Sequence, residues 1–383
     1  MPHWLIVSGN ARAIAQSCAG AGWTCDVVDP FADTDTVALA QRAVQARFDG
    51  SGFDRDLPAQ VAALGGRWHG VITGSGFERR PELLDELLRF APLAGNDAAT
   101  VRRCKTPQRI AEGLRAADVS FAPVRIDGAA DAGWLFKSIG GCGGSHVRLA
   151  RAGEAIPPGN YAQRRIDGDA ASVLFLADGV RGRVIGVTRQ RPGSVAGPFA
   201  WCEAVSDLPL DESQSAAIAR DVDAMAREFG LRGLNGADLV MGSGGHVVVE
   251  INPRPTATMA LYESRVQGGL FAAHVAACTT GMDGLVMLPD EAFRGTRVIY
   301  APECIVIAAD VAWPEWCTDR PAAGSLVAEA APLCTVHATA TDTEHVTSLL
   351  RERERMMLNM FGHASGQMMK ETVFSPRRKN DYC

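Results

Sequence analysis

The chain has 383 residues, of which 47% are hydrophobic and 21% charged, and its formal net charge is −6. This length exceeds what one hydrophobic core usually supports, so we expect two or three structural units. The mild charge gives no electrostatic footprint for nucleic acid, and neither a membrane-spanning run nor a signal-peptide core is recognisable. We therefore expect a cytoplasmic protein without nucleic-acid or membrane partners.

The first hundred residues alternate between short apolar runs and helical patterns. Strands are predicted at residues 4–8, 25–28 and 70–73. This alternation predicts a parallel sheet with helices on both faces. Ligands of such sheets bind beyond the carboxyl ends of the strands. The candidates there for substrate contacts, which could equally be ordinary turn residues, are Gly9, Asn10, Ser75 and Glu78.

A glycine-rich segment follows a short apolar strand predicted at residues 134–137. Glycines occupy four of the five positions from 140 to 144. Backbone amides in such a loop can approach a ligand closely, which makes it a candidate phosphate loop; the alternative is a flexible surface hairpin. Lys137 ends the apolar strand, where a lysine seldom lacks a partner, and phosphate is an obvious one.

A hairpin with acidic side chains is predicted further along the chain. The β-branched run 245–252 indicates a strand, and the apolar run 236–241 reaches it through a glycine-rich connection. If the loop has an odd number of residues, such as 242–246, Asp238 lies directly opposite Glu250. A four-residue loop would turn Asp238 to the other face, because a slip of one residue reverses every side chain.

The oxygen-bearing side chains of this hairpin predict a metal site. Glu250 and Asn252 are two positions apart, so they project from the same face of a strand. With Asp238 they offer the carboxylate and amide oxygens that Mg²⁺ prefers, and Arg254 stands next to them. The alternative is that each is an ordinary strand-end or turn residue. For the group as a whole we favour the metal.

Helical patterns and short strands complete the chain. An amphipathic helix is predicted from Asp211 to Phe229, closed by Gly230, and Thr341 with Glu344 offers a capping box for a last helix through Phe361. The other predicted elements are helices at 83–90 and 107–114 and strands at 298–300, 304–307 and 334–336.

The order of these motifs resembles the ATP-grasp superfamily of carboxylate ligases. The resemblance covers most of the chain and implies an α/β fold with α+β lobes. It implies a Rossmann-like N-terminal (pre-ATP-grasp) domain at 1–100 and a two-lobed nucleotide-binding domain at 101–290, with the small lobe at about 120–165. A β-rich C-terminal domain with a terminal helix follows at 291–365, and a disordered tail is expected at 366–383.

The resemblance also implies roles for individual residues in binding ATP with Mg²⁺ or Mn²⁺. Catalytic roles fall to Lys137, on the nucleotide phosphates, and Arg254, beside the transferred phosphoryl group and the substrate. The metal ligands are Asp238, Glu250 and Asn252. Residues implied to contact the nucleotide are Lys105, the loop residues Gly140, Gly141, Gly143, Gly144 and Ser145, and the adenine segment Gln163, Arg164, Arg165 and Ile166.

The adenine segment departs from the family pattern. Acidic residues usually occur there, one of them contacting the ribose, whereas this chain has a glutamine and two arginines at 163–165. Asp169 follows shortly after and is included among the nucleotide-binding candidates.

The implied activity is ATP-dependent joining of a carboxylate to an amine through an acyl phosphate, with release of ADP and phosphate. Residues 74–78, 95–96 and 252–256 are also similar to a subgroup in methanofuran and tetrahydromethanopterin biosynthesis, the tyramine–glutamate ligases. We therefore expect a small-molecule carboxylate, such as glutamate, and an amine as partners, and a homodimer is compatible with the sequence. The alternatives are an ATP-grasp kinase, a bicarbonate-activating carboxylase, or a nucleotide-binding subunit without turnover.

Overall fold

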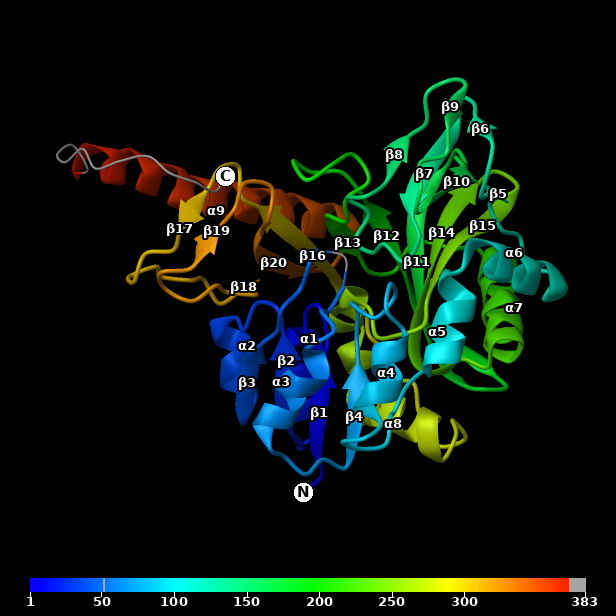
Figure 1. Ribbon diagram of the computed structural model, residues 1–383, viewed down its shortest axis with the longest axis horizontal. Helices are drawn as coiled ribbons and strands as arrows, with labels where there is room; N and C mark the ends of the chain where they lie inside the picture. Colours follow the sequence, from blue (N-terminus) through cyan, green and yellow to red (C-terminus); the bar gives the residue numbers. More distant parts are fainter. Residues whose placement is uncertain (51, 372–383) are drawn as a thin grey trace.

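A parallel sheet forms the N-terminal part of the chain in the computed structural model, which describes residues 1–50 and 52–371 (Figure 1). Its strands are paired in the order β3-β2-β1-β4. Side chains alternate between its faces: Trp4 and Ile6 pack with α1, whereas Leu5 and Val7 pack with α3 and α4. The predicted parallel sheet with helices on both faces is confirmed. The elements are β1 (His3–Val7), α1 (Arg12–Gly20), β2 (Thr24–Asp29), α2 (Thr34–Leu39), β3 (Arg42–Gln45), α3 (Leu57–Leu64), β4 (Gly70–Thr73) and α4 (Glu82–Leu87).

A small antiparallel sheet follows two helices. Its strand order is β5-β10-β7-β8, and the predicted strand with Lys137 is β7. A short ribbon of β6 and β9 extends from it (Figure 1). The elements are α5 (Ala98–Lys105), α6 (Pro107–Ala116), β5 (Val124–Arg125), β6 (Ala129–Ala130), β7 (Trp134–Ser138), β8 (Arg148–Leu149), β9 (Glu154–Ala155) and β10 (Asn160–Arg164).

A long antiparallel sheet continues from the middle of the chain, where a nucleotide-binding domain was predicted, into its last strands. Its order is β15-β14-β11-β12-β13-β16-β20-β18, so it crosses the domain boundary predicted at residue 290. Helix α7 packs on the face that carries Val173 and Phe175, and α8 packs on the opposite face with Leu174 and Leu176. The strands are β11 (Asp169–Asp178), β12 (Gly182–Arg191), β13 (Glu203–Val205), β14 (Arg232–Gly242), β15 (Gly245–Asn252), β16 (Phe293–Tyr300), β18 (Cys317–Thr318) and β20 (Pro332–Ala340).

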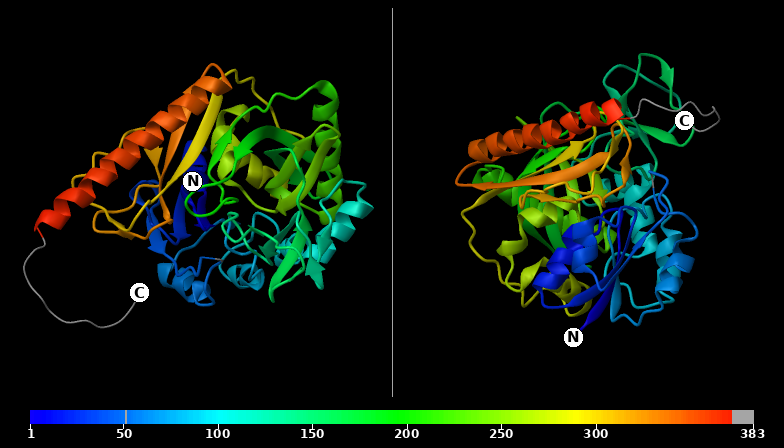
Figure 2. Two further views of the ribbon diagram at one scale, coloured as in Figure 1. Left: turned by 90° about the horizontal axis from the view of Figure 1, so that it is seen from above. Right: turned by 90° about the vertical axis from the view of Figure 1, so that its left-hand side faces the viewer.

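The C-terminal half is completed by helices and one further ribbon. Helix α9 lies along β16 and β20 (Figures 1 and 2). The remaining elements are α7 (Glu212–Phe229), the 3-10 helices η1 (Ala257–Leu261) and η2 (Glu263–Arg265), α8 (Gly269–Thr279), β17 (Ile305–Val306), β19 (Leu326–Val327) and α9 (Thr343–Glu371).

The two helices whose ends were predicted from the sequence have different outcomes. The predicted helix from Asp211 is confirmed as α7, whose capping box joins Asp211 and Gln214 and which ends at Gly230 in a left-handed conformation with φ 65°. The capping box predicted at Thr341 is wrong. Asp342 instead accepts a hydrogen bond from the amide of His345 at 2.8 Å, three positions on, as an N-cap residue does.

The last helix is also longer than predicted. It continues past Phe361 to Glu371, into the segment for which a disordered tail was expected, and residues 372–383 lie outside the described part of the chain. Within residues 1–50 and 52–371, no helix is both long and apolar enough to cross a membrane.

Candidate active site

The acidic hairpin is formed by β14 and β15, and Asp238 does lie opposite Glu250. Neither loop length considered from the sequence is present, because Gly242 pairs with Gly245 and the turn between them has two residues. A β-bulge restores the facing arrangement: Leu239 pairs with Val248, so one extra residue precedes Glu250. The extra residue shifts the side-chain alternation of β15 by one position, and this shift places Glu250 opposite Asp238.

The three predicted metal ligands converge. The Nδ2 atom of Asn252 donates to Oδ2 of Asp238 at 3.1 Å. Lys105, the last residue of α5, places its Nζ atom 2.5 Å from Oε1 of Glu250 and 2.9 Å from Oδ1 of Asn252. Gln190, which the sequence did not single out, donates from β12 to Oδ1 of Asp238 at 3.4 Å. The hairpin and the end of α5 therefore form one polar network.

Opposite charges determine the ionisation of this network. Burial disfavours the charged form of Glu250, but the ammonium groups of Lys105 and Lys137 outweigh it and hold the pKa of Glu250 at about 2. Burial and the nearby charge of Glu250 raise the pKa of Asp238. Burial also lowers the pKa of Lys137, although the carboxylates of Glu250 and Asp238 offset part of this effect. The site thus pairs concentrated negative and positive charge in a largely buried place.

The donor set fits a magnesium ion bound together with phosphate. Two carboxylates and an amide oxygen are hard ligands of the kind that Mg²⁺ takes from protein while nucleotide and water supply the rest. In the described residues, no group of three or more histidine, cysteine, aspartate or glutamate side chains is arranged to hold a metal ion. A metal here would therefore use Asp238, Glu250 and the amide of Asn252 and would still need oxygens from the nucleotide or water.

The glycine-rich loop is held between two other segments of the chain. Gly140 has φ 71°, and a Cβ atom on it would lie 2.8 Å from Cα of Arg79. Gly144 has φ 77°, and a Cβ atom there would lie 2.0 Å from the carbonyl oxygen of Phe199. The amide of Trp201 donates to the carbonyl of Gly143 at 2.9 Å. Glycine is thus needed for both the backbone conformation and the close approach.

A small cavity lies between this loop, β7 and the hairpin. Its volume is about 30 Å³, far below the ~300–1,000 Å³ of pockets that hold small ligands, so the surrounding segments must separate before a nucleotide can enter. The lining residues are Cys104, Lys105, Pro107, Ile110, Phe121, Lys137, Ser138, Gly140, Gly141, His146, Tyr161, Val249 and Glu250.

Several residues that line this cavity were not identified from the sequence. Tyr161 reaches it because β10 pairs with β7 so that Tyr161 lies opposite Lys137. Ile110 and Phe121 add apolar surface, and His146 follows the glycine-rich loop. Only His146 had a local signal, its position beside the loop; the others depend on strand pairing and helix packing.

The sequence of this region matches a known domain family. Residues 105–258 match the profile of the ATP-grasp domain, and they include the lysines, the glycine-rich loop and the acidic hairpin. This part of the chain is similar to the ATP-grasp domain family. No curated protein sequence matches the chain.

Solved structures extend the likeness beyond the ATP-grasp domain. An L-amino acid ligase from Bacillus licheniformis superposes with a TM-score of 0.68 at 14% identity, covering 92% of this chain and 96% of that one. The biotin carboxylase domain dimer of 2-oxoglutarate carboxylase from Hydrogenobacter thermophilus, in complex with MgADP, ADP and bicarbonate, gives 0.69 at 12% identity, with 91% and 88% covered. N5-carboxyaminoimidazole synthetase from Staphylococcus aureus with ADP gives 0.63 at 14% identity, with 94% and 97% covered. The predicted ATP-grasp architecture is confirmed as the fold.

The adenine segment of the ATP-grasp domain has structural contacts of its own. Gln163 is buried, and its Nε2 atom donates to the carbonyl of Val249 at 3.1 Å, joining the small sheet to the hairpin. The guanidinium of Arg164 lies 5.9 Å from the ring centroid of Trp134. Nucleotide contacts of this segment and of Asp169 stay predictions. Members that do not line the described cavity are Gln163, Arg164, Arg165, Ile166 and Asp169.

The substrate candidate Glu78 is occupied by contacts within the protein. Its Oε1 atom lies 2.6 Å from Nε of Arg254, and its Oε2 atom accepts the amide of Gly76 at 2.7 Å. Burial opposes ionisation of Glu78, but the charges of Arg254 and Lys105 hold its pKa below the ordinary value. Arg254 also reaches Oδ1 of Asn252 at 3.4 Å. Glu78 therefore positions Arg254 beside the ATP-grasp site.

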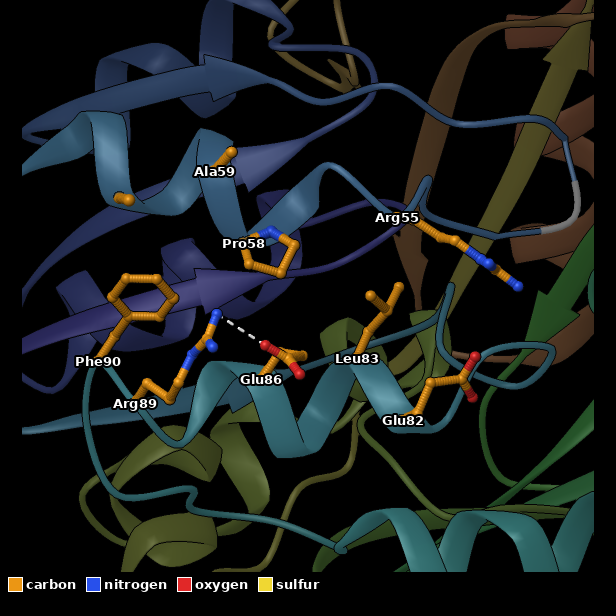
Figure 3. A pocket seen from close by; sticks show the side chains of 9 residues that line it. Arg55, Pro58, Ala59, Glu82, Leu83, Glu86, Arg89 and Phe90 are labelled. Carbon is orange, nitrogen blue, oxygen red and sulfur yellow. Dashed lines mark ion pairs between the residues drawn. The ribbon is translucent and has the colours of Figure 1, made fainter.

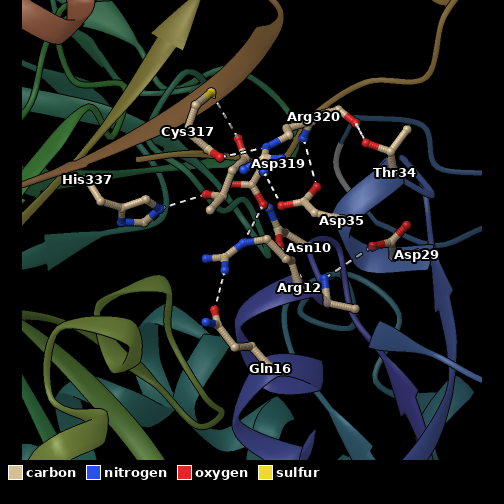
Figure 4. Close-up of polar contacts among 12 residues, drawn as sticks. Asn10, Arg12, Gln16, Asp29, Thr34, Asp35, Cys317, Asp319, Arg320 and His337 are labelled. Atoms are coloured by element: carbon tan, nitrogen blue, oxygen red, sulfur yellow. Dashed lines mark hydrogen bonds and ion pairs between the residues drawn. The ribbon is translucent and has the colours of Figure 1, made fainter. Parts of the chain in front are cut away.

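The candidates at the strand ends lie at the junction with the C-terminal part of the chain. The Nδ2 atom of Asn10 donates to Oδ1 of Asp319 at 3.0 Å, and Nε of Arg12 lies 3.1 Å from the same oxygen (Figure 4). The amide of Gly9 donates to the carbonyl of Ser75 at 2.7 Å. Asn10 thus joins two parts of the fold, and substrate contacts of Gly9, Asn10 and Ser75 stay predictions.

A larger and more open groove lies elsewhere, between α3 and α4 (Figure 3). Its volume is about 830 Å³, and no residue predicted for the site is among the described residues that line it. Charged side chains such as Arg55, Glu82 and Glu86 surround it in solvent. The polar network around Asp238 and Glu250 therefore remains the candidate site, although it is the smaller hollow.

Proposed function

We propose that the protein is an ATP-dependent carboxylate–amine ligase. The observation that carries this proposal is the convergence, within an ATP-grasp domain, of hard oxygen ligands with cationic side chains. Asp238 and Glu250 face each other, and Lys105 and Arg254 contact the same amide oxygen of Asn252. This arrangement suits a triphosphate whose charge must be both held and neutralised.

The proposed reaction has two steps. A substrate carboxylate attacks the γ-phosphorus of ATP, which forms an acyl phosphate and releases ADP. The amine then attacks the acyl carbon, and the carbon–oxygen bond to phosphate breaks, so the products are an amide and inorganic phosphate. When bound to Asp238, Glu250 and Asn252, Mg²⁺ supplies positive charge to the phosphate oxygens.

The protein's own groups bind and orient the reactants in this scheme. Lys105 and Lys137 border the cavity and can bind phosphate oxygens. Arg254 is held by Glu78, and within the described residues its two Nη atoms make only long contacts, at 3.3 Å with Pro255 and 3.4 Å with Asn252, so they can bind the substrate carboxylate or the transferred phosphoryl group. The closed glycine-rich loop, packed against Arg79 and Phe199, protects an acyl phosphate from water.

The finer part of the proposal concerns the substrates. We propose a small amino-acid-like carboxylate such as glutamate and a tyramine- or tyrosine-like amine, in a one-carbon coenzyme pathway. This part is supported by the similarity of residues 74–78 and 252–256 to the tyramine–glutamate ligases. The structure gives one reason for the pairing of these segments, since Glu78 from the first contacts Arg254 from the second.

A bicarbonate-activating carboxylase is the second candidate. One of the similar structures is a biotin carboxylase domain in complex with MgADP, ADP and bicarbonate, and bicarbonate is also a carboxylate-like nucleophile toward the γ-phosphate. The two candidates differ in what ADP release depends on. A ligase needs a carboxylate and an amine, whereas a carboxylase needs bicarbonate.

The test is an ADP-release assay with Mg-ATP over amino acids and amines, with and without bicarbonate, combined with calorimetric titration of Mg-ATP. ADP release that needs both an amino acid and an amine supports the ligase. Release that needs bicarbonate, or that proceeds with a phosphorylated product and no amine, supports the carboxylase or a kinase. Nucleotide binding without turnover on any acceptor would support a non-catalytic subunit and overturn the proposal.

A further inference from the structure

We propose that the ammonium group of Lys105 competes with the divalent metal for Glu250 and Asn252, so that the metal enters this site together with the nucleotide and not alone. This inference rests on the proposed function, because it takes Glu250 and Asn252 as the metal ligands. It assigns Lys105 a second task besides phosphate binding, namely control of the order in which ligands bind.

The contact that carries the inference is direct. Nζ of Lys105 lies 2.5 Å from Oε1 of Glu250 and 2.9 Å from Oδ1 of Asn252, and both oxygens belong to the proposed metal ligands. The side chains of Lys105 and Glu250 are 6% and 29% exposed, so the ammonium side of the ion pair is shielded from solvent. A metal ion that takes these two oxygens must therefore displace the ammonium.

The displaced ammonium then needs a new anionic partner. Lys105 borders a cavity that it shares with Lys137, Gly140 and Gly141, and a second lysine and backbone groups do not compensate a buried positive charge. Of the other carboxylates near Lys105, Asp238 would be coordinated by the same metal, and Glu78 is already paired with Arg254. Metal binding alone thus leaves a buried ammonium unpaired, at a cost comparable to breaking a buried ion pair.

A triphosphate removes this difficulty. The cavity lies beside the glycine-rich loop, where the resemblance places the β- and γ-phosphates. Phosphate oxygens there can accept hydrogen bonds from the ammonium group of Lys105 after it leaves Glu250. Metal and nucleotide therefore bind with positive cooperativity, because the binding of each lowers the free-energy cost of binding the other. The wild-type chain is expected to bind Mn²⁺ at this site weakly without nucleotide and tightly with it.

The experiment is a Mn²⁺ titration followed by the electron paramagnetic resonance signal of free Mn²⁺, with and without a non-hydrolysable ATP analogue. Wild type is compared with Lys105→Met, which removes the competing ammonium but keeps most of the side-chain volume. Lys137→Met is the matched control: in the described residues Lys137 makes no ion-pair contact with Glu250, although its charge acts on the same carboxylate.

Without nucleotide, Lys105→Met is expected to bind Mn²⁺ at least about tenfold more tightly than wild type, and Lys137→Met is expected to change the affinity clearly less. The analogue should tighten Mn²⁺ binding in wild type and should do so much less in Lys105→Met. Lys105→Gln, which is neutral but can still donate a hydrogen bond to Glu250, provides a second variant if the methionine variant does not fold.

Three negative results have different meanings. If wild type binds Mn²⁺ equally well with and without nucleotide, and Lys105→Met behaves in the same way, the competition is overturned while the metal site stands. If Mn²⁺ does not bind even with the analogue, or binds unchanged in Glu250→Gln, the proposed metal site itself is wrong. Equal tightening in Lys105→Met and Lys137→Met would mean that general charge, not the contact, controls metal binding, and would also overturn the inference.

Discussion

The ion pair between Glu78 and Arg254 gives a prediction whose size can be worked out from the structure. The two side chains are 3% and 15% exposed, and their closest atoms are 2.6 Å apart. Removing one partner of such a pair leaves the other charge buried, which typically costs about 3–5 kcal/mol. We therefore expect Glu78→Ala to lower the free energy of unfolding of the affected unit by about 3 kcal/mol or more.

Glu78→Gln separates charge from hydrogen bonding at the same position. The amide oxygen can still accept from Arg254 or Gly76, so the loss should be nearer the ~1.5–3 kcal/mol of a hydrogen bond to a charged group. In the double variant Glu78→Gln with Arg254→Met, no unpaired guanidinium remains. The combined loss should therefore be smaller than the sum of the single losses by at least about 1 kcal/mol.

The assay is urea unfolding monitored by tryptophan fluorescence, together with hydrogen exchange of the Gly76 amide, which Glu78 protects. Glu86→Gln is the matched control, since its ion pair with Arg89 has exposures of 45% and 66% and should contribute less than about 1 kcal/mol. The reasoning is refuted if Glu78→Gln costs no more than Glu86→Gln and the losses of the double-variant cycle are additive.

Three further predictions concern Gly144 in the glycine-rich loop, the buried carboxyl group of Asp33 and the proposed metal ligand Glu250. Gly144→Ala should weaken Mg-ATP binding at least about tenfold in calorimetry, because its Cβ atom would meet the carbonyl of Phe199 at 2.0 Å, whereas Gly143→Ala, with a similar positive φ but open space, should change it less. Burial and neighbouring aspartates raise the pKa of Asp33 to about 8, so its contribution to stability is complete below about pH 4 and is lost as the pH rises through 8. Thermal unfolding at pH 5, 7 and 9 should show a steeper loss in wild type than in Asp33→Asn, and equal slopes would contradict the assignment. Glu250→Gln should reduce Mg-dependent ATP binding at least about tenfold and abolish ADP release, and an unchanged titration would speak against the metal site.

The sequence was sufficient for those features whose physical cause is local. Alternation of apolar runs gave the parallel sheet, and capping residues gave both ends of α7. From the sequence, the facing of Asp238 and Glu250 depended on an odd number of loop residues, but a two-residue turn and a bulge produce it. A bulge depends on how a strand bends against its neighbours, and the strand composition alone does not reveal it.

Long-range contacts account for what the sequence did not show. Glu78 and Asn10 were recognised as polar residues at strand ends, yet their partners, Arg254 and Asp319, come from distant parts of the chain. Gln190 reaches Asp238 only because β12 enters the long sheet two strands from β14. Such partners follow from topology, which a single sequence without pairing information leaves open.

The unbroken long sheet has a mechanical consequence. Backbone hydrogen bonds connect the strand of Glu250 with the last strands of the chain, so hinge bending between these regions would break a ladder of bonds at once. The small sheet is a separate ladder, attached near Phe121 and Val248. We therefore expect opening for nucleotide exchange to be a rotation of the small sheet over a rigid base, in which case a covalent tether between the two would trap whatever molecule is inside.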